Sequence, residues 1–190
     1  IIKGVMTVIE PITNVDILLA TYNGEKFLAE QLASIECQTF SQWRLIVRDD
    51  GSTDDTVVIL SEFRDRFPDK VLLIEDSESN LGPMRNFERL LSHSDAPYFL
   101  FCDQDDVWMD TKIAILLDLM SSVEAEESSG KAVLIHSDLR VVDTDLQMVA
   151  LSMWEYQYID PKRCRWNHLV VQNVVTGCAS MGNASLRQIS

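Results

Sequence analysis

Positive charge is scarce in this sequence: 16 Lys and Arg residues stand against 30 Asp and Glu residues, a net charge of −14 in 190 residues. Binding to nucleic acid or to anionic lipid usually requires a basic surface, so both functions are disfavoured. Long apolar runs are also lacking, since none approaches the roughly 18 residues that a membrane helix needs. We therefore expect no nucleic-acid partner and no membrane insertion by this chain.

Paired cysteine motifs are missing as well. The four cysteines are spread along the chain as Cys37, Cys102, Cys164 and Cys178, with no CxxC and no zinc-ligand spacing. This pattern predicts free thiols in a reducing, cytoplasmic compartment. If this chain is part of a longer protein, the predicted cytoplasmic location includes the region next to the inner face of the membrane.

Strand and helix patterns alternate along the chain. Short apolar runs typical of buried strands are followed by stretches whose apolar residues recur at helical spacing. The expected strands are 15–20, 43–47, 71–74, 98–102, 131–136, 141–142 and 174–181, with a polar surface loop at 121–130. In the helix after Pro83, we expect Met84, Phe87, Leu90 and Leu91 to be buried. The alternation predicts an α/β fold, a three-layer α/β/α sandwich around a mostly parallel central sheet.

Three carboxylates within four residues follow the apolar run 98–102: Asp103, Asp105 and Asp106. Carboxylates this close repel one another, so a folded chain keeps them together mainly to bind a cation. Mg²⁺ and Mn²⁺ prefer such oxygen ligands. We therefore expect a Mn²⁺ or Mg²⁺ site at the end of this strand.

Two further polar clusters follow strands, at 21–23 and 49–52. Each alone fits an ordinary turn. The carboxyl ends of parallel strands, however, lie at one edge of a sheet, where α/β proteins bind ligands. The three clusters are therefore expected to converge on one site.

The order and spacing of these motifs resemble the family-2 nucleotide-sugar glycosyltransferases with the GT-A fold. The matching segments are 20–24, 38–40, 49–56, Asn80 with Gly82, and 103–108, and they span roughly the first 110 residues. The last segment, Asp-Gln-Asp-Asp-Val-Trp, is most similar to the rhamnosyltransferase-like branch, which builds cell-wall or capsular polysaccharide. The resemblance implies metal-dependent, inverting transfer of a sugar, for example rhamnose. The donor would be UDP- or dTDP-linked, and the acceptor a hydroxyl of a glycan or lipid-linked glycan.

The resemblance also implies roles for individual positions. Asp105 would bind the metal, and Asp103 the donor ribose or the metal through water. Asp50 would accept a hydrogen bond from the imide N–H of uracil or thymine, because a carboxylate is an acceptor and pyrimidine N3–H a donor. The implied nucleotide-binding residues are Ala20, Thr21, Tyr22, Asn23, Glu25, Asp50, Arg85 and Gln104. Residues 1–190 would form a single domain, with 1–110 as the donor half and 111–190 as the start of an incomplete acceptor half.

General physics gives the metal independent support. A nucleoside diphosphate brings two or more negative charges to a chain that is itself strongly acidic. A divalent cation between carboxylate and phosphate resolves this repulsion and stabilises the charge on the departing diphosphate.

Several of these residues also have structural interpretations. Glu25 could cap the first helix, Arg85 could be a surface charge, and Asp106 could cap a turn. Three others are open between a structural role and contact with substrate: Trp108, His136, and Cys178 in a segment that resembles the acceptor side of the family.

A catalytic base is lacking. An inverting transferase needs a group that takes the proton of the attacking hydroxyl, and the family places an Asp beyond the segment that residues 176–178 resemble. The last carboxylate of this chain is Asp160. We therefore expect the base beyond Ser190, in a longer protein, and name no catalytic residue. Two alternatives are a non-catalytic nucleotide-sugar-binding module and an aspartyl-phosphate phosphotransferase of the haloacid dehalogenase type. The latter is disfavoured because its motif belongs on the first strand.

Overall fold

The computed structural model describes residues 15–126, 130–163 and 174–189. Strands and helices alternate as the sequence predicts. The elements of the first part are β1 (Val15–Thr21), α1 (Leu28–Glu36), β2 (Trp43–Asp49), α2 (Thr56–Arg66), β3 (Val71–Leu73), α3 (Pro83–Ser92), β4 (Tyr98–Cys102) and α4 (Lys112–Glu126). The remaining elements are β5 (Leu134–His136), β6 (Val141–Val142), β7 (Met148–Ala150), α5 (Met153–Tyr156), the 3₁₀ turn η1 (Gly177–Ala179), β8 (Ser180–Asn183) and α7 (Ala184–Arg187).

Six strands form the central sheet, in the order β3-β2-β1-β4-β8-β5. The pairs β1–β2, β1–β4 and β2–β3 are parallel, whereas β8 runs antiparallel to both of its neighbours. The predicted mostly parallel sheet is therefore confirmed. Strand order reverses on either side of β1, which opens a crevice at the carboxyl ends of β1, β2 and β4.

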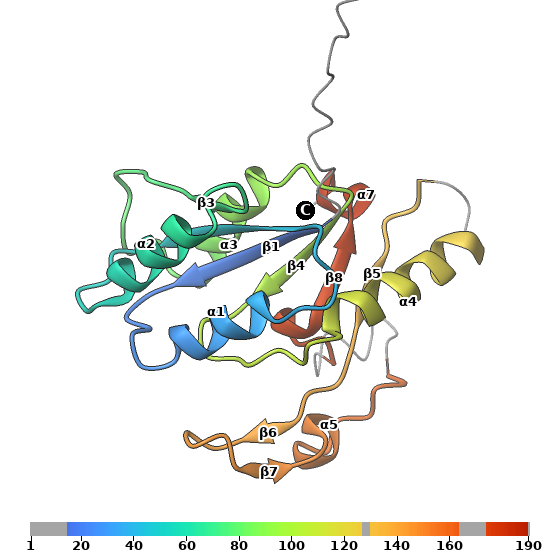
Figure 1. The fold of residues 1–190 in the computed structure, drawn as a ribbon. Coiled ribbons are helices and arrows are strands. Elements are labelled where there is room, and N and C mark those ends of the chain that lie inside the picture. Colours follow the sequence, from blue (N-terminus) through green and yellow to red (C-terminus); the bar gives the residue numbers. More distant parts are fainter. Residues whose placement is uncertain (1–14, 127–129, 164–173, 190) are drawn as a thin grey trace, which may run out of the picture.

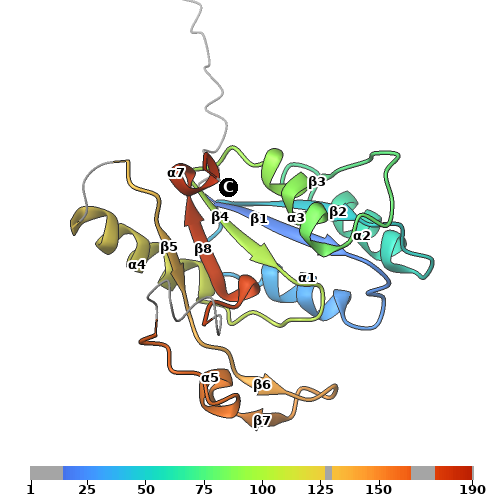
Figure 2. The same cartoon turned by 180° about the vertical axis from the view of Figure 1, so that it is seen from behind.

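Helices cover both faces of this sheet (Figures 1 and 2). One face packs against α1, α2 and α4, and the other against α3 and α7. Strand β1 shows why its sequence is almost continuously apolar: Val15, Ile17 and Leu19 face the first layer, and Leu18 faces the second. The three-layer α/β/α architecture is thus confirmed.

Helix α4 is longer than the sequence analysis predicts. It continues to Glu126, so the first six residues of the expected loop 121–130 are helical. The polar residues there occupy an exposed or half-exposed helix surface, and a polar helix face and a polar loop look alike in a sequence. Packing of Ile113, Leu116 and Met120 against the core stabilises the first part of α4, from which the helix continues through residues 121–126.

The last strand is shorter than expected. Residues 174–176 have no regular structure, and β8 begins only at Ser180 after the turn η1. The apolar run at 174–181 predicts a strand, because apolar periodicity alone does not distinguish a buried strand from a buried turn. Strand β5 likewise begins at residue 134 rather than 131.

Met84 was expected in the buried stripe of α3, but its side chain is 82% exposed. Helix α3 instead turns Asn86 toward the sheet, where it is buried together with Leu90. A buried polar residue has no signature in an apolar pattern, which explains the error.

A two-stranded sheet of β6 and β7 lies apart from the main sheet together with α5 (Figure 1). It confirms the expected strand at residues 141–142 and its tight turn, whereas β7 was not predicted. In the described parts of the chain, no helix is long and apolar enough to cross a bilayer.

Candidate donor-binding site

A cavity of about 480 Å³ opens at the carboxyl ends of β1, β2 and β4. Seven of the ten predicted site residues line it: Ala20, Thr21, Tyr22, Asp50, Asp103, Gln104 and Asp105. The ends of the three strands therefore converge on one cavity, as the sequence predicts. The remaining lining residues come from the segment before α3 and from α3 itself: Asn80, Gly82, Pro83, Asn86 and Phe87.

Two of the cavity walls are joined by Gln104. Its side-chain Oε1 accepts from the backbone N–H of Tyr22 at 2.9 Å, and its Nε2 donates to the Tyr22 carbonyl at 3.1 Å. The amide thus pairs with the Tyr22 backbone as a neighbouring strand would. Gly24 leaves room for this amide, because a Cβ there would lie 2.4 Å from Gln104 Oε1 and would displace it. The position of Tyr22, which is half exposed, follows from this pairing.

The floor of the cavity contains Asp50, which is only 5% exposed. Oδ1 accepts from the backbone N–H of Leu81 at 2.9 Å and from Arg48 Nη1 at 3.1 Å, and Oδ2 accepts from the N–H of Gly82 at 2.8 Å. Its own N–H donates to the Thr21 carbonyl at 2.9 Å. Backbone and side chain of Asp50 are therefore both fixed.

Asp50 remains a carboxylate despite its burial. Burial alone would raise its pKa, but the two backbone N–H groups and the Arg48 guanidinium outweigh it, and the pKa lies below its usual value. Asp50 is therefore an acceptor of hydrogen bonds at neutral pH.

Asn23 and Glu25 lie outside the cavity lining, in a network that joins the loop after β1 to the loop after β2. The N–H of Asn23 donates to Ser52 Oγ at 2.8 Å, and its Oδ1 accepts from the Thr53 N–H at 2.9 Å. Glu25 Oε2 accepts from the Asp55 N–H at 3.0 Å. These contacts are structural, and they hold the two loops together behind the cavity.

Arg85 lies on the far side of α3 from the cavity lining. It lines a smaller depression of about 260 Å³ with Glu78, Leu81, Glu88, Arg89 and Ser92. The structure therefore separates Arg85 from the other predicted nucleotide-binding residues.

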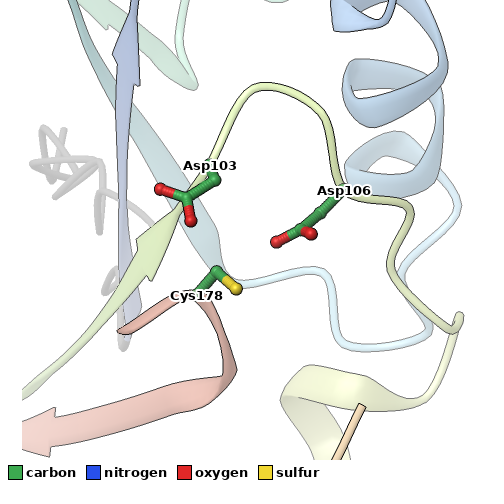
Figure 3. Close-up of side chains that lie close together, drawn as sticks. All are labelled: Asp103, Asp106 and Cys178. Carbon is green, nitrogen blue, oxygen red and sulfur yellow. The ribbon is translucent and has the colours of Figure 1, made fainter. Parts of the chain in front are cut away.

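An acidic cluster lies at the mouth of β4. The ligand atoms of Asp103, Asp106 and Cys178 all fall within 4.8 Å of one another, and Figure 3 shows the three side chains grouped at the end of β4. Cys178 comes from η1, so this cluster joins the two halves of the chain. The sequence predicted Asp103 and Asp105 as the metal-site pair. The structure groups Asp103 with Asp106 and Cys178, and Asp105 is exposed in the cavity lining.

The electrostatics of the cluster reflect its burial. The pKa of Asp103 is raised by burial and by the negative charges of Asp106 and Asp105. Burial also raises the pKa of the Cys178 thiol, with the neighbouring carboxylates acting in the same direction. Lys112 partly offsets this charge, and its Nζ donates to the Cys178 carbonyl at 2.7 Å. At neutral pH Cys178 is therefore a neutral thiol.

This donor set fits a hard divalent cation. Asp103 and Asp105 both present carboxylates to the cavity, and within the described chain the buried Asp106 Oδ2 has no hydrogen-bond partner. Oxygen ligands of this kind suit Mg²⁺ or Mn²⁺. A neutral thiol beside them adds no charge.

Two of the residues left open do not line the cavity. Trp108 is 5% exposed and lies within the apolar core, with Lys112 Nζ 3.8 Å from its ring centroid. His136 on β5 contacts the Trp154 ring at a centroid distance of 5.7 Å and does not line the cavity.

The sequence analysis missed the contribution of α3 to the site. Asn80 and Gly82 were noted in the family resemblance, but the turn was interpreted only as a helix start. Phe87 was expected only in the buried stripe of the helix, and Arg48 and Asn86 were not singled out at all. The available signal was Arg48, a cation that directly follows the buried apolar run 45–47 of β2.

Comparison with known proteins agrees with this geometry. Residues 16–189 match the model of Glycosyl transferase family 2. The dTDP-rhamnosyl transferase RfbG of Shigella flexneri is 36% identical over 105 residues, which is 54% of this chain and 36% of that protein. The poly(ribitol-phosphate) beta-N-acetylglucosaminyltransferase TarS of Staphylococcus aureus is 34% identical over 92 residues, 47% of this chain and 16% of TarS. The chain spans about a third of the length of RfbG and of two other curated relatives.

Solved structures share the fold. S. aureus TarS 1-349 in complex with UDP has a TM-score of 0.56 at 23% identity, over 68% of this chain and 36% of that one. The mannosyltransferase PcManGT from Pyrobaculum calidifontis, in complex with GDP-Man and Mn²⁺, has a TM-score of 0.63 at 18% identity, over 93% of this chain and 46% of that one. The family match covers nearly the whole chain, and the architecture agrees with it: the chain belongs to Glycosyl transferase family 2, with the GT-A fold.

Proposed function

We propose that this chain binds a nucleoside-diphosphate sugar in the cavity at the ends of β1, β2 and β4, and contributes to transfer of the sugar to a glycan hydroxyl. One observation carries the proposal: a fixed, ionised acceptor, Asp50, and a carboxylate pair, Asp103 and Asp105, line the same cavity. The first suits a base N–H, and the second suits a cation bound to a diphosphate.

The base would lie between the loop after β1 and Asp50. The Tyr22 ring, half exposed beside Gln104, offers a face for stacking, and Asp50 accepts from the N3–H of a pyrimidine. UDP- and dTDP-linked donors fit this chemistry. Two relatives carry such donors in their names, dTDP in RfbG and UDP-Glc in WfgD of Escherichia coli.

The diphosphate would lie toward Asp103 and Asp105. A divalent cation held by these carboxylates would neutralise the leaving diphosphate. Without one, the negative cluster would repel the donor. The Mn²⁺ in the PcManGT complex supports this expectation for a protein of the same fold.

The transfer itself would be a single displacement. The acceptor oxygen forms a bond to the anomeric carbon while the bond from that carbon to the diphosphate oxygen breaks, which inverts the configuration. The acceptor proton passes to a base, which we expect outside residues 1–190. Rhamnose as the sugar, and a cell-wall or capsular glycan as the acceptor, are the finer proposals that the RfbG likeness supports.

The test is binding of UDP, dTDP, GDP and ADP with and without Mn²⁺, measured by calorimetry and by the thermal unfolding midpoint. Saturation at a hundredfold Kd would add about 2.7 kcal/mol to the free energy of unfolding. We expect one pyrimidine diphosphate plus Mn²⁺ to bind, and Asp50→Ala and Asp105→Ala to abolish that binding. Asp118→Ala, which removes an exposed carboxylate from α4, is the matched control.

Full binding by both Asp50→Ala and Asp105→Ala would refute the proposed site. Binding by the unmodified chain without transfer by the whole protein would instead identify a nucleotide-sugar-binding module. The whole protein would then lack an Asp in the region where the family places its base.

A further inference from the structure

Arg48 is a buried cation directly beneath the cavity floor. It is the second-to-last residue of β2, and its side chain lies on the α3 side of the sheet and is 1% exposed. A guanidinium buried without partners would cost several kcal/mol, so its contacts must be satisfied. Residue 48 is also the one charged position of β2 that is fully buried.

Five hydrogen bonds engage the whole fork. Nε and Nη2 donate to the two oxygens of Asp76 at 2.9 and 2.8 Å, and Nη2 also donates to the Glu78 carbonyl at 2.6 Å. Nη1 donates to Asp50 Oδ1 at 3.1 Å and to Asn86 Oδ1 at 3.3 Å. A guanidinium has five N–H donors, so none is left over. Arg48 therefore ties β2, the segment before α3 and α3 itself to one point.

The contact with Asp50 decides how many acceptor positions that residue has left. An ionised carboxylate offers about four lone-pair positions, two on each oxygen. On Oδ1 both are taken, by Arg48 and by the Leu81 N–H; on Oδ2 one is taken, by the Gly82 N–H. One position on Oδ2 remains.

One open position suits one donor. Uracil and thymine present a single N–H, at N3, between two carbonyl oxygens. Guanine presents two neighbouring donors, N1–H and the 2-amino group, which pair best with a carboxylate whose two oxygens are both open. Contact patterns of this kind discriminate between bases by about 1–3 kcal/mol.

We propose that Arg48 is a positioning residue that sets base selectivity: by occupying Oδ1 of Asp50, it leaves one acceptor position and so favours a pyrimidine diphosphate over GDP. This inference rests on the proposed donor site and deepens it. Arg48 itself does not line the cavity and acts only through Asp50 and Asn86, which do.

The test compares Kd values for UDP and GDP, each with Mn²⁺, in the unmodified chain and in Arg48→Lys. Lysine keeps the charge but loses the fork, so it cannot hold Asp76, Asp50 and Asn86 together. We expect the preference for UDP over GDP to fall by roughly tenfold, which corresponds to about 1.4 kcal/mol.

Arg44→Lys is the matched control. Arg44 lies on the same strand and the same face, and its fork likewise holds both oxygens of a buried carboxylate, Asp16, at 2.9 and 3.0 Å. It lies at the opposite end of β2 from the cavity. We expect this variant to lower the unfolding midpoint but to leave the UDP-to-GDP ratio unchanged.

Asp76→Ala is the second variant, and it tests the inference if Arg48→Lys does not fold. The Asp76 side chain is 30% exposed and outside the cavity lining, and its removal takes away the two hydrogen bonds from Arg48 Nε and Nη2. We expect a smaller fall of the same ratio.

An unchanged ratio in Arg48→Lys, or in Asp76→Ala where only that variant folds, would overturn the inference and leave the proposed function intact. If the unmodified chain binds no nucleoside diphosphate, the proposed function fails, and the inference fails with it. The two failures are therefore distinguishable.

Discussion

The strands around the cavity and the hairpin segment, residues 139–158, are organised by different forces. In β1 every residue but one is buried, and β2 and β4 are nearly as enclosed. In the hairpin segment, which contains β6, β7 and α5, no residue is buried. Large apolar side chains are exposed there, among them Leu151 at 75% and Tyr158 at 93%. The first region is stabilised by a core and the second is not.

Hydrogen bonds to one carboxylate replace the core in the hairpin segment. Asp138 Oδ1 accepts from the N–H groups of Leu139, Met153 and Trp154 at 2.8, 3.1 and 3.2 Å. This anchors both ends of the excursion at β5. The comparison teaches that a surface excursion in this fold can be anchored by hydrogen bonds to a polar residue, and Asp50 anchors the segment before α3 in the same way.

The largest effect should come from the core. Leu100→Ala removes a fully buried side chain from β4, and we expect it to lower the free energy of unfolding by about 3 kcal/mol. Leu151→Ala in the hairpin segment should change it by less than about 0.5 kcal/mol. Chemical denaturation of both variants measures the difference, and equal losses would show that the hairpin segment is part of the cooperative core.

A local effect should follow from Asp138→Ala. Three backbone N–H groups lose their acceptor, at a cost of about 1–3 kcal/mol. Because the segment contributes nothing to the core, we expect faster hydrogen exchange at residues 139–156 and little change in the global unfolding midpoint. A cooperative loss of the whole fold would contradict this account.

A smaller effect is expected at the cavity wall. Gln104→Ala removes both hydrogen bonds to the Tyr22 backbone, and we expect roughly tenfold weaker binding of the preferred nucleotide, about 1.4 kcal/mol. Gly24→Ala should weaken binding similarly, because its Cβ would displace the same amide. Gln147→Ala, whose side chain bonds only within the hairpin turn, is the control for calorimetry. Unaltered affinity in Gln104→Ala would show that Tyr22 does not need this pairing.

The smallest effect concerns acid. Burial would raise the pKa values of Asp50 and Asp138, but hydrogen bonds to each outweigh it, so both lie below their usual value. Their contribution to stability is present above the unfolded pKa of about 3.9 and is lost as the pH falls through the lower native values. We expect the thermal unfolding midpoint to decrease as the pH is lowered below about 4. The decrease should be smaller in Asp50→Asn than in the unmodified chain. An identical acid dependence in the variant would refute the assignment.

The parts of the fold that the sequence predicts are those with a strong period. β1, β2 and β4 and the polar residues after them were found from apolar runs that stop abruptly, and seven predicted residues therefore meet in one cavity. The end of α4 and the start of β8 were misplaced because a polar helix end and a buried turn give no contrary signal.

The site was harder to predict where it depends on contacts between distant segments. Nothing local shows that Arg48 reaches Asp76 and Asn86, or that Cys178 returns to Asp103 and Asp106. Arg85 is the opposite case: it lies in the first turn of α3, close in sequence to cavity residues, yet it is on the other side of the helix from the cavity. The position of a residue in the sequence indicates that it lies near a site but not which way its side chain faces.

The antiparallel strand β8 has a consequence for the order in which the chain folds. It pairs with β4 on one side and β5 on the other, although nearly eighty residues separate it from β4 in the sequence. During synthesis β1, β2 and β4 can assemble first, leaving one edge of β4 unpaired until residues 180–183 leave the ribosome. An open edge of this kind invites pairing with other chains. Cys178 arrives with the same segment, so the acidic cluster is completed in the step that closes the sheet.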